Sequence, residues 1–345
     1  MKTTNKYQIK SPSVVDALTA DDYALVNPPA NVFSCTTVIG APKPYFLKRR
    51  HDKELERDVS DNFWMFDGSA VHYALEMSNM QPSTERKSEE RMFIEVPMHE
   101  GRQIPDWKCY LAVAEPGETR IDVAKQEWYD KDKFYLSMQY DCFEIAEKCL
   151  EDYKRTQPWE IVYGLKPERE CQLNIGAFGL RLLGHEVNKL RVCFFLKNWD
   201  KFQAGKGDYP VIPYAEMYPN VWPNTMCEKY IIDRMKLFIA CSKASDNDIP
   251  DCTFEERWAS ETEYALMKST AGKWNKKSSK NFKKFEMDNG FADRFQKEQE
   301  TKYPASTFRI EERLGIDKRC ADYCVAKRFC TYYNKTHIEV GQSGY

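Results

Sequence analysis

The sequence predicts an α/β or α+β fold in which a mixed central sheet is flanked by helices. Short strand-like segments, FYLSMQYDCFEI, CLEDYKRT and LRVCFFLK, lie between segments whose apolar residues recur at helical spacing. Strands framed by helices indicate a sheet that packs against those helices. With 345 residues, 42% of them hydrophobic, the chain can bury a core as one large domain or two ordinary ones.

The N-terminal third is expected to begin with a segment that packs on the core. Residues 1–60 should form helix and loop, including a solvated helix at KRRHDKELERD. In DNFWMFDGSAVHYALEM, the apolar residues recur at helical spacing, which predicts a helix from about Gly68. The following range, 81–130, is polar and rich in proline and charge, which predicts strands and loops.

The core of the fold is expected in residues 61–250. A short AEK turn joins FYLSMQYDCFEI to CLEDYKRT, which predicts a hairpin-like pair of strands. Beyond it we expect a buried helix at QLNIGAFGLRLLG, a central strand at LRVCFFLK and an amphipathic helix at MCEKYIIDRMKLFIACSK. Residues 251–345 are lysine-rich and are expected to be mostly helical up to a terminal cysteine cluster, as part of the same domain.

Composition says more about where the protein is expected to be found than about its function. The formal net charge of −2 neither requires nor excludes a nucleic-acid partner, which a local basic surface would have to hold. No apolar run is long enough to cross a membrane, and the first residues lack the apolar stretch of a secretion signal. We therefore expect a soluble, cytosolic protein whose twelve cysteines are mostly reduced thiols.

Two acids and a lysine stand out on the expected hairpin. Asp152 and Lys154 are two residues apart on one strand, so their side chains point to the same face. Asp141, on the first strand, can approach Asp152 across the pair. Close carboxylates repel unless a cation lies between them, and hard oxygen ligands favour Mg²⁺ or Mn²⁺. A lysine beside such a cation suits phosphodiester hydrolysis. The alternative without a catalytic role is a solvated strand face, because an acid–x–lysine triplet is common in a chain with 30% charged residues.

His72 is the second unusual residue, because it lies among apolar neighbours in GSAVHYALE. A histidine in that position is either a hydrogen-bonded core residue or a metal ligand. The residue alone does not decide between the two, and the core role is the commoner one.

The order of these motifs carries a family resemblance. Gly68–x–x–x–His72, Asp141, Asp152–Tyr153–Lys154 and then a helix opening with Gln172 resemble the RecB-like branch of the PD-(D/E)xK nucleases. That branch includes phage-encoded and CRISPR-associated exonucleases with a cysteine-ligated cluster. The pattern extends over residues 60–335. QLNIGAF resembles the glutamine motif, and the segments CTFEERW, EYALMK and RCADYCVAKRFC resemble the tail of phage-encoded members.

The resemblance implies a restriction-endonuclease-like core and a role for each motif residue. His72, Asp141, Asp152 and the carbonyl of Tyr153 would bind Mg²⁺ or Mn²⁺. Lys154 would be the catalytic lysine, and Gln172 would orient the lysine or the DNA backbone. The implied activity is that of a metal-dependent DNA exonuclease in phage replication or recombination, with a single-strand annealing protein as a possible partner.

Two positions depart from the family pattern and motivate a second hypothesis. Met138 stands where the family usually has glycine, and Gly176 stands where the glutamine motif usually has tyrosine. Neither departure removes a metal ligand. The alternative is a weakened or inactive nuclease fold that acts as a DNA-binding or partner-docking module.

Three cysteines close the chain at tight spacing: Cys320, Cys324 and Cys330. A fourth thiolate would complete a zinc site or an iron–sulfur cluster, and either would tie the end of the chain to an earlier segment. The resemblance favours a structural [4Fe–4S] cluster over zinc, with Cys252 as the fourth ligand and Cys35 as its rival. The alternative is three reduced cysteines on a surface helix and turn.

A basic segment, KSTAGKWNKKSSKNFKKF, gathers seven lysines and no acid. Lysines interleaved with aromatic residues can neutralise phosphates and stack exposed bases, although a solvated helix face is the usual reading of such a run. The predicted DNA-binding residues are Lys273, Trp274, Lys276, Lys277, Lys280, Lys283 and Lys284.

Overall fold

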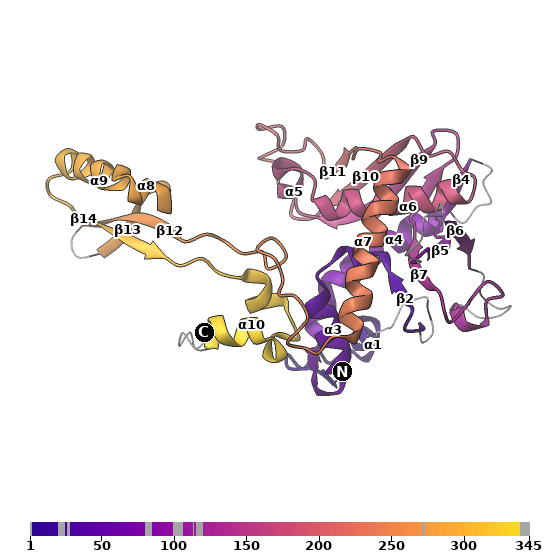
Figure 1. The fold of residues 1–345 in the computed structure, drawn as a ribbon. Helices are drawn as coiled ribbons and strands as arrows, with labels where there is room; N and C mark the ends of the chain where they lie inside the picture. The colour runs from indigo at the N-terminus through magenta and orange to yellow at the C-terminus, as the bar shows by residue number, and fades with distance from the viewer. Residues whose placement is uncertain are drawn as a thin grey trace. The chain divides into compact units, whose positions relative to one another are not determined.

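A computed structural model gives the fold of the chain, and it has the mixed α+β character that the sequence predicts (Figure 1). The structure describes residues 2–19, 25, 28–79, 85–98, 106–112, 114, 120–270 and 273–338. The chain divides into two compact units, Met1–Ile249 and Pro250–Tyr345. Whether the second unit belongs to the same domain as the first stays a prediction. No helix in the described ranges has the length and apolarity needed to span a bilayer.

Two mixed sheets form the first unit. One has the strand order β11-β10-β9-β8-β4, with β9 and β10 parallel and the other neighbours antiparallel. Its strands are β4 (Arg86–Ser88), β8 (Cys142–Glu144), β9 (Cys149–Thr156), β10 (Lys189–Leu196) and β11 (Tyr214–Met217). The other has the order β2-β7-β5-β6, and its strands are β2 (Val32–Ser34), β5 (Arg91–Val96), β6 (Lys108–Leu111) and β7 (Phe134–Gln139).

The two sheets meet where the chain crosses between them twice. One crossing runs from β4 to β5 through Glu89 and Glu90, and the other runs from β7 to β8 through Tyr140 and Asp141. The crossings are hydrogen-bonded to each other, since the Glu89 N–H donates to the Tyr140 carbonyl at 3.1 Å. The expected hairpin is therefore right for β8 and β9, but FYLSMQ pairs in the other sheet. Asp141 lies in the break between β7 and β8 and not within a strand.

Helices cover these sheets. They are α1 (Pro12–Thr19), α2 (Cys35–Ile39), α3 (Pro42–Arg50), α4 (Phe63–Asn79), α5 (Trp159–Tyr163), α6 (Pro167–Leu182) and α7 (Asn224–Lys243). The predicted helices at α4, α6 and α7 are confirmed, as is the central position of β10. The helix predicted at KRRHDKELERD is wrong. α3 ends at Arg50, η1 (Asp52–Glu54) follows, and β3 (Glu56–Asp58) pairs in parallel with β1 (Lys2–Thr4). The remaining short turns are η2 (Val59–Asn62) and η3 (Val123–Lys125).

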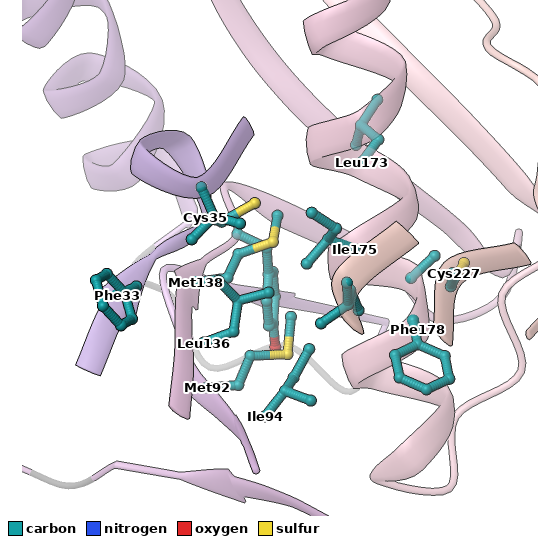
Figure 2. Packing of buried hydrophobic residues seen from close by; sticks show 14 of the residues in the cluster. Phe33, Cys35, Met92, Ile94, Leu136, Met138, Leu173, Ile175, Phe178 and Cys227 are labelled. Carbon is teal, nitrogen blue, oxygen red and sulfur yellow. The ribbon is translucent and has the colours of Figure 1, made fainter. Parts of the chain in front are cut away.

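Met138 and Gly176 meet where α6 packs against the four-stranded sheet, in the buried cluster drawn in Figure 2. A Cβ atom on Gly176 would lie 2.6 Å from Cε of Met138, so the methionine fills the space that glycine leaves. Gly179 receives Met92 in the same way, and Met92 and Met138 are cross-strand neighbours on β5 and β7. Met138 and Gly176 thus form one large-with-small packing pair. Gln172 lies one helical turn before Gly176 on α6, on the side that faces the sheets.

The second unit contains a small antiparallel sheet in the order β13-β12-β14, made of β12 (Glu263–Thr270), β13 (Lys273–Lys283) and β14 (Thr307–Arg313). α8 (Lys284–Asp288) and α9 (Phe291–Lys302) pack on it, and Leu266, Phe282, Ala292 and Phe308 form its core. The prediction of a mostly helical tail is therefore wrong. Lysine favours helices only weakly, and pairing with β12 outweighs that preference.

The end of the chain folds back on the segment that enters the second unit. It forms η4 (Arg319–Tyr323), η5 (Lys327–Phe329), α10 (Thr331–Tyr333) and η6 (Asn334–Ile338). The Arg319 N–H donates to the Arg257 carbonyl at 2.9 Å, and the Arg257 guanidinium pairs with Asp317 at 3.1 Å. The segment after Cys252 is thereby held against the segment that carries the last three cysteines.

Candidate metal centre

The register of β8 and β9 brings the two predicted acids together. Cys142 pairs with Glu151, so Asp141, one residue before Cys142, lies beside Asp152, one residue after Glu151. The Tyr153 N–H donates to Oδ2 of Asp141 at 2.5 Å and fixes that carboxylate at the break in the sheet. The sequence thus predicted the approach of the two acids correctly, although Asp141 reaches it from a bend.

Asp152 is the most deeply buried of the predicted site residues, with 3% of its surface exposed. Its Oδ1 accepts hydrogen bonds from Nζ of Lys154 at 2.5 Å and from Nε2 of Gln172 at 3.0 Å. Its Oδ2 is buried and accepts no hydrogen bond in the part of the chain that the structure describes. A buried carboxylate oxygen without a donor is costly unless something absent from the chain itself, such as a cation, binds it.

His72 reaches the same place from α4. Its Nδ1 lies 3.7 Å from Oδ1 of Asp141, and the side chain is about one-third exposed. An ion pair between Asp67 and Arg155, 3.2 Å long, holds this helix on β9. The histidine lies beside the Asp141 carboxylate and is partly exposed, so it is not a fully buried core residue.

Glu89 joins the site without having been expected there. Ligand atoms of His72, Glu89 and Asp141 all lie within 4.8 Å of one another. Glu89 occupies the crossing from β4 to β5, and the sequence before that crossing is polar and gives no periodic signal. In the sequence, SEERM resembles any solvated charged segment. Only the long-range pairing of the two strand crossings brings this carboxylate to Asp141.

The carboxylates affect one another strongly. The pKa of Asp141 is raised to about 6, mainly by burial and then by the negative charge of Asp152. The positive charges of Lys154 and His72 act in the opposite direction. The pKa of Glu89 is raised to about 7, mainly by burial and then by the negative charge of Asp141. Such a group of acids resists full ionisation and gains from a bound cation.

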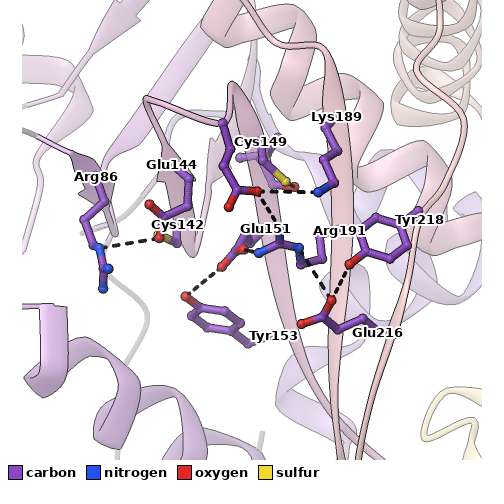
Figure 3. Close-up of polar contacts among 12 residues, drawn as sticks. Arg86, Cys142, Glu144, Cys149, Glu151, Tyr153, Lys189, Arg191, Glu216 and Tyr218 are labelled. Atoms are coloured by element: carbon purple, nitrogen blue, oxygen red, sulfur yellow. Dashed lines mark hydrogen bonds and ion pairs between the residues drawn. The ribbon is translucent and has the colours of Figure 1, made fainter.

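The opposite face of β9 carries a second polar cluster (Figure 3). Cys142, Glu144 and Glu151 also have ligand atoms within 4.8 Å of one another, and the two glutamates border a cavity of about 260 Å³. Here, however, guanidinium groups accompany the acids. Arg191 pairs with Glu151, and Arg86 lies 3.4 Å from Glu144. The charges of this cluster are already balanced by the protein.

The predicted cluster cysteines lie in the second unit. Burial raises the pKa of Cys252 to about 12, with Cys320 and Cys330 among the charged neighbours that contribute. Cys35 has other neighbours: it is buried in the core of the first unit, near Cys171. No three of the thiols of Cys252, Cys320, Cys324 and Cys330 lie within 4.8 Å of one another. The choice of Cys252 over Cys35 stays a prediction.

The basic segment lies on β13 and the start of α8. Lys283 and Lys284 are exposed, and the ring of Trp274 lies 4.4 Å from the guanidinium carbon of Arg309. The side chains of the other predicted lysines, Lys273, Lys276, Lys277 and Lys280, lie outside the described residues.

Comparisons with known proteins give no family for the chain. No family model matches it, and no curated protein matches it. A solved structure described as "Crystal structure of SSO0001" matches 65% of this chain and 82% of its own, at 12% identity and a TM-score of 0.38. A likeness of that size is too slight to assign a fold or a function.

Proposed function

We propose that the protein is a metal-dependent DNA exonuclease of the RecB-like PD-(D/E)xK type, which hydrolyses phosphodiester bonds. The observation that carries the proposal is the unpaired, buried Oδ2 of Asp152 next to Asp141 and Lys154. A buried carboxylate with a purely structural role normally has both oxygens hydrogen-bonded. A cation ligand that awaits Mg²⁺ or Mn²⁺ would leave one oxygen unpaired.

The chain offers a role for each residue around this oxygen. His72, Asp141 and Asp152, with the Tyr153 carbonyl, would hold the cation, which would lower the pKa of a bound water and offset charge on the phosphate. Lys154, whose ammonium donates to Oδ1 of Asp152, is placed to contact the same water or a phosphate oxygen. Gln172 donates to the same oxygen and would keep the Asp152 carboxylate in one orientation.

The packing of Met138 against Gly176 supports the catalytic reading over the binding-module reading. The two departures from the family pattern compensate each other sterically within the core. Both residues are buried apolar packing positions, and the polar contacts of Asp152, Lys154 and Gln172 are formed beside them. Met138 and Gly176 therefore give little reason to expect a weakened enzyme.

We propose that the terminal cysteines, with Cys252, hold a structural [4Fe–4S] cluster, with zinc as the alternative. Cys320 and Cys330 are among the charged neighbours that act on Cys252, which supports the grouping of these thiols. The cluster would be structural, and it would fix the entry to the small β12–β14 sheet with its basic β13 strand, which we propose as the DNA-binding surface.

The test is a cleavage assay on end-labelled single- and double-stranded DNA with Mn²⁺, using anaerobically purified protein. Wild-type protein should degrade the label from an end, and Asp152→Ala should not. Iron and sulfide content and a thermal melt would establish that both proteins are folded and carry their cluster. Absence of cleavage by folded wild-type protein on both substrates would overturn the proposal. An annealing protein remains a proposed partner, to be tested by co-purification.

A further inference from the structure

A cavity of about 540 Å³ lies beyond the end of β9, at the segment that joins this strand to α6. It is lined by Thr156 at the end of β9, by Trp159 and Tyr163 of α5, and by Lys166 just before α6. Ligand sites in proteins commonly have a volume in this range. The lining combines aromatic rings with a cation, which is the chemistry that recognises a nucleotide.

The two aromatic side chains of α5 are exposed at this cavity. Trp159 is 51% exposed and Tyr163 is 83% exposed. Their rings are stacked, with centroids 6.1 Å apart and planes inclined by 24°. The buried Tyr209 packs edge-to-face with Trp159 at 5.9 Å and supports its ring. Exposed rings that the fold holds in one place offer a stacking surface for a nucleobase.

The polar side of the cavity is organised around Glu160, which is buried. Its carboxylate accepts a hydrogen bond from Oγ1 of Thr156 at 2.8 Å and pairs with Lys166 and Arg169, both at 3.3 Å. Two cations for one carboxylate leave one positive charge in this group. The Lys166 side chain is 59% exposed, so its ammonium can also contact a phosphate group in the cavity.

β9 leads from the candidate metal centre to this cavity. Asp152, Lys154 and Thr156 alternate with other residues along the strand, so their side chains lie on one face. Two strand residues span about 7 Å, so Thr156 lies that far beyond Lys154. One nucleotide of an extended strand can cover this distance. A DNA strand with a phosphate at Lys154 would therefore bring its neighbouring nucleotide to the cavity.

We propose that this cavity binds one unpaired nucleotide of the DNA strand, next to the scissile phosphate. The base stacks on Trp159 and Tyr163, and the phosphate of that nucleotide contacts Lys166. A base inside a duplex is covered on both faces by its neighbours, so the subsite accepts a base only after it has left the duplex. This inference rests on the proposed nuclease function and adds a specificity subsite to it.

The test is the affinity of the full, cluster-loaded protein for fluorescent oligothymidylates in which one base at a time is replaced by an abasic residue. Lys154→Ala is the background, so that Mn²⁺ can hold the strand without cleavage. Loss of the base at one position should weaken binding about tenfold. Adding Trp159→Leu and Tyr163→Leu should weaken binding of the intact strand by a similar factor and abolish the sensitivity at that position. Tyr7→Leu is the matched control, since Tyr7 is 77% exposed but does not line the cavity, and it should change neither value.

The outcomes separate this inference from the proposed function. Equal affinity for every abasic strand, in a protein whose wild type cleaves DNA, would overturn the subsite and leave the nuclease intact. Unchanged DNA binding after loss of both rings, in protein that a thermal melt shows to be folded, would also overturn it and would assign the rings to another partner, such as a protein. A position-specific loss that depends on the two rings, in a protein whose wild type cleaves no DNA, would support the subsite and overturn the nuclease.

Discussion

The two faces of β9 carry acidic clusters of similar composition but opposite electrostatic character. On one face, Glu151 pairs with Arg191, and the same guanidinium contacts Glu147 at 2.7 Å and Glu216 at 3.8 Å. On the other face, Asp152 pairs with the ammonium of Lys154, Asp141 lies beside it at the break in the sheet, and Oδ2 of Asp152 has no partner among the described residues. Both clusters contain three potential metal ligands at short range.

The difference shows that ligand spacing alone does not identify a metal site. Where arginine is already in contact with the acids, a divalent cation would have to displace a charged partner. Where carboxylates outnumber positively charged side chains and one oxygen is unpaired, a bound cation would offset the desolvation cost of that buried oxygen. Alternation along a single strand separates the two cases, since neighbouring residues of β9 point to opposite faces.

The largest expected effect is on catalysis. Lys154→Ala should reduce cleavage by a factor of about 10³ or more while DNA binding stays within a few-fold, because the lysine acts on the water or phosphate and not on the DNA at large. Glu151→Gln, on the opposite face, should change cleavage by less than about tenfold. Rate and gel-shift measurements on both variants give the comparison, and equal losses in the two would contradict the assignment of the faces.

The second expected effect is on stability, and it concerns the paired face. Arg191→Met should lower the free energy of unfolding by about 3 kcal/mol, because it leaves Glu151 buried without its partner. Lys189→Met is a suitable control, since Lys189 also contacts Glu147 but its side chain is 43% exposed, against 16% for Arg191, and it should cost less than about 0.5 kcal/mol. Urea denaturation measures both. A cost for Arg191→Met no larger than that of the control would show that the network is not a stabilising one.

The unpaired face should give a pH dependence of the opposite sign to ordinary ion pairs. The pKa of Asp141 is raised to about 6, mainly by burial and then by Asp152, so the folded state binds the proton more tightly than the unfolded state. Metal-free protein should therefore lose stability as pH rises from about 4 to about 6, by roughly 1–3 kcal/mol from this group. Saturating Mn²⁺ at neutral pH should restore it.

Asp141→Asn tests the sign directly. The variant should be more stable than metal-free wild-type protein at pH 7 and nearly equal to it at pH 4, and it should gain little from Mn²⁺. Thermal melts with and without the ion give the result. A variant less stable than the wild type at pH 7 would mean that the ionised carboxylate stabilises the fold.

The smallest expected effect is the energetic coupling between two packing positions behind the site. Met138→Ala should cost about 2–4 kcal/mol through the space it leaves, and Gly176→Ala in that background should recover about 1 kcal/mol. In the wild type the same alanine would meet Met138 and gain nothing. A double-mutant cycle measures this coupling, and additive effects would contradict the contact.

The sequence by itself determined the local, periodic features of this protein. A period of two placed Asp152 and Lys154 on one face of β9, helical spacing identified α4 and α7, and a long apolar run identified α6. It also indicated which residue types could meet a cation. These features follow from backbone geometry over a few residues, so they can be read without knowledge of distant contacts.

The tertiary structure alone decided the features that depend on pairing between distant segments. Glu89 reaches Asp141 only because the crossings between the sheets are bonded to each other, and Met138 explains Gly176 only through the packing of α6. The lysine-rich run became a strand because β12 was available to pair with it. Long-range pairing and burial outweigh local propensity. The orientation of the Asp152 carboxylate is likewise set by its hydrogen bonds with Lys154 on β9 and Gln172 on α6.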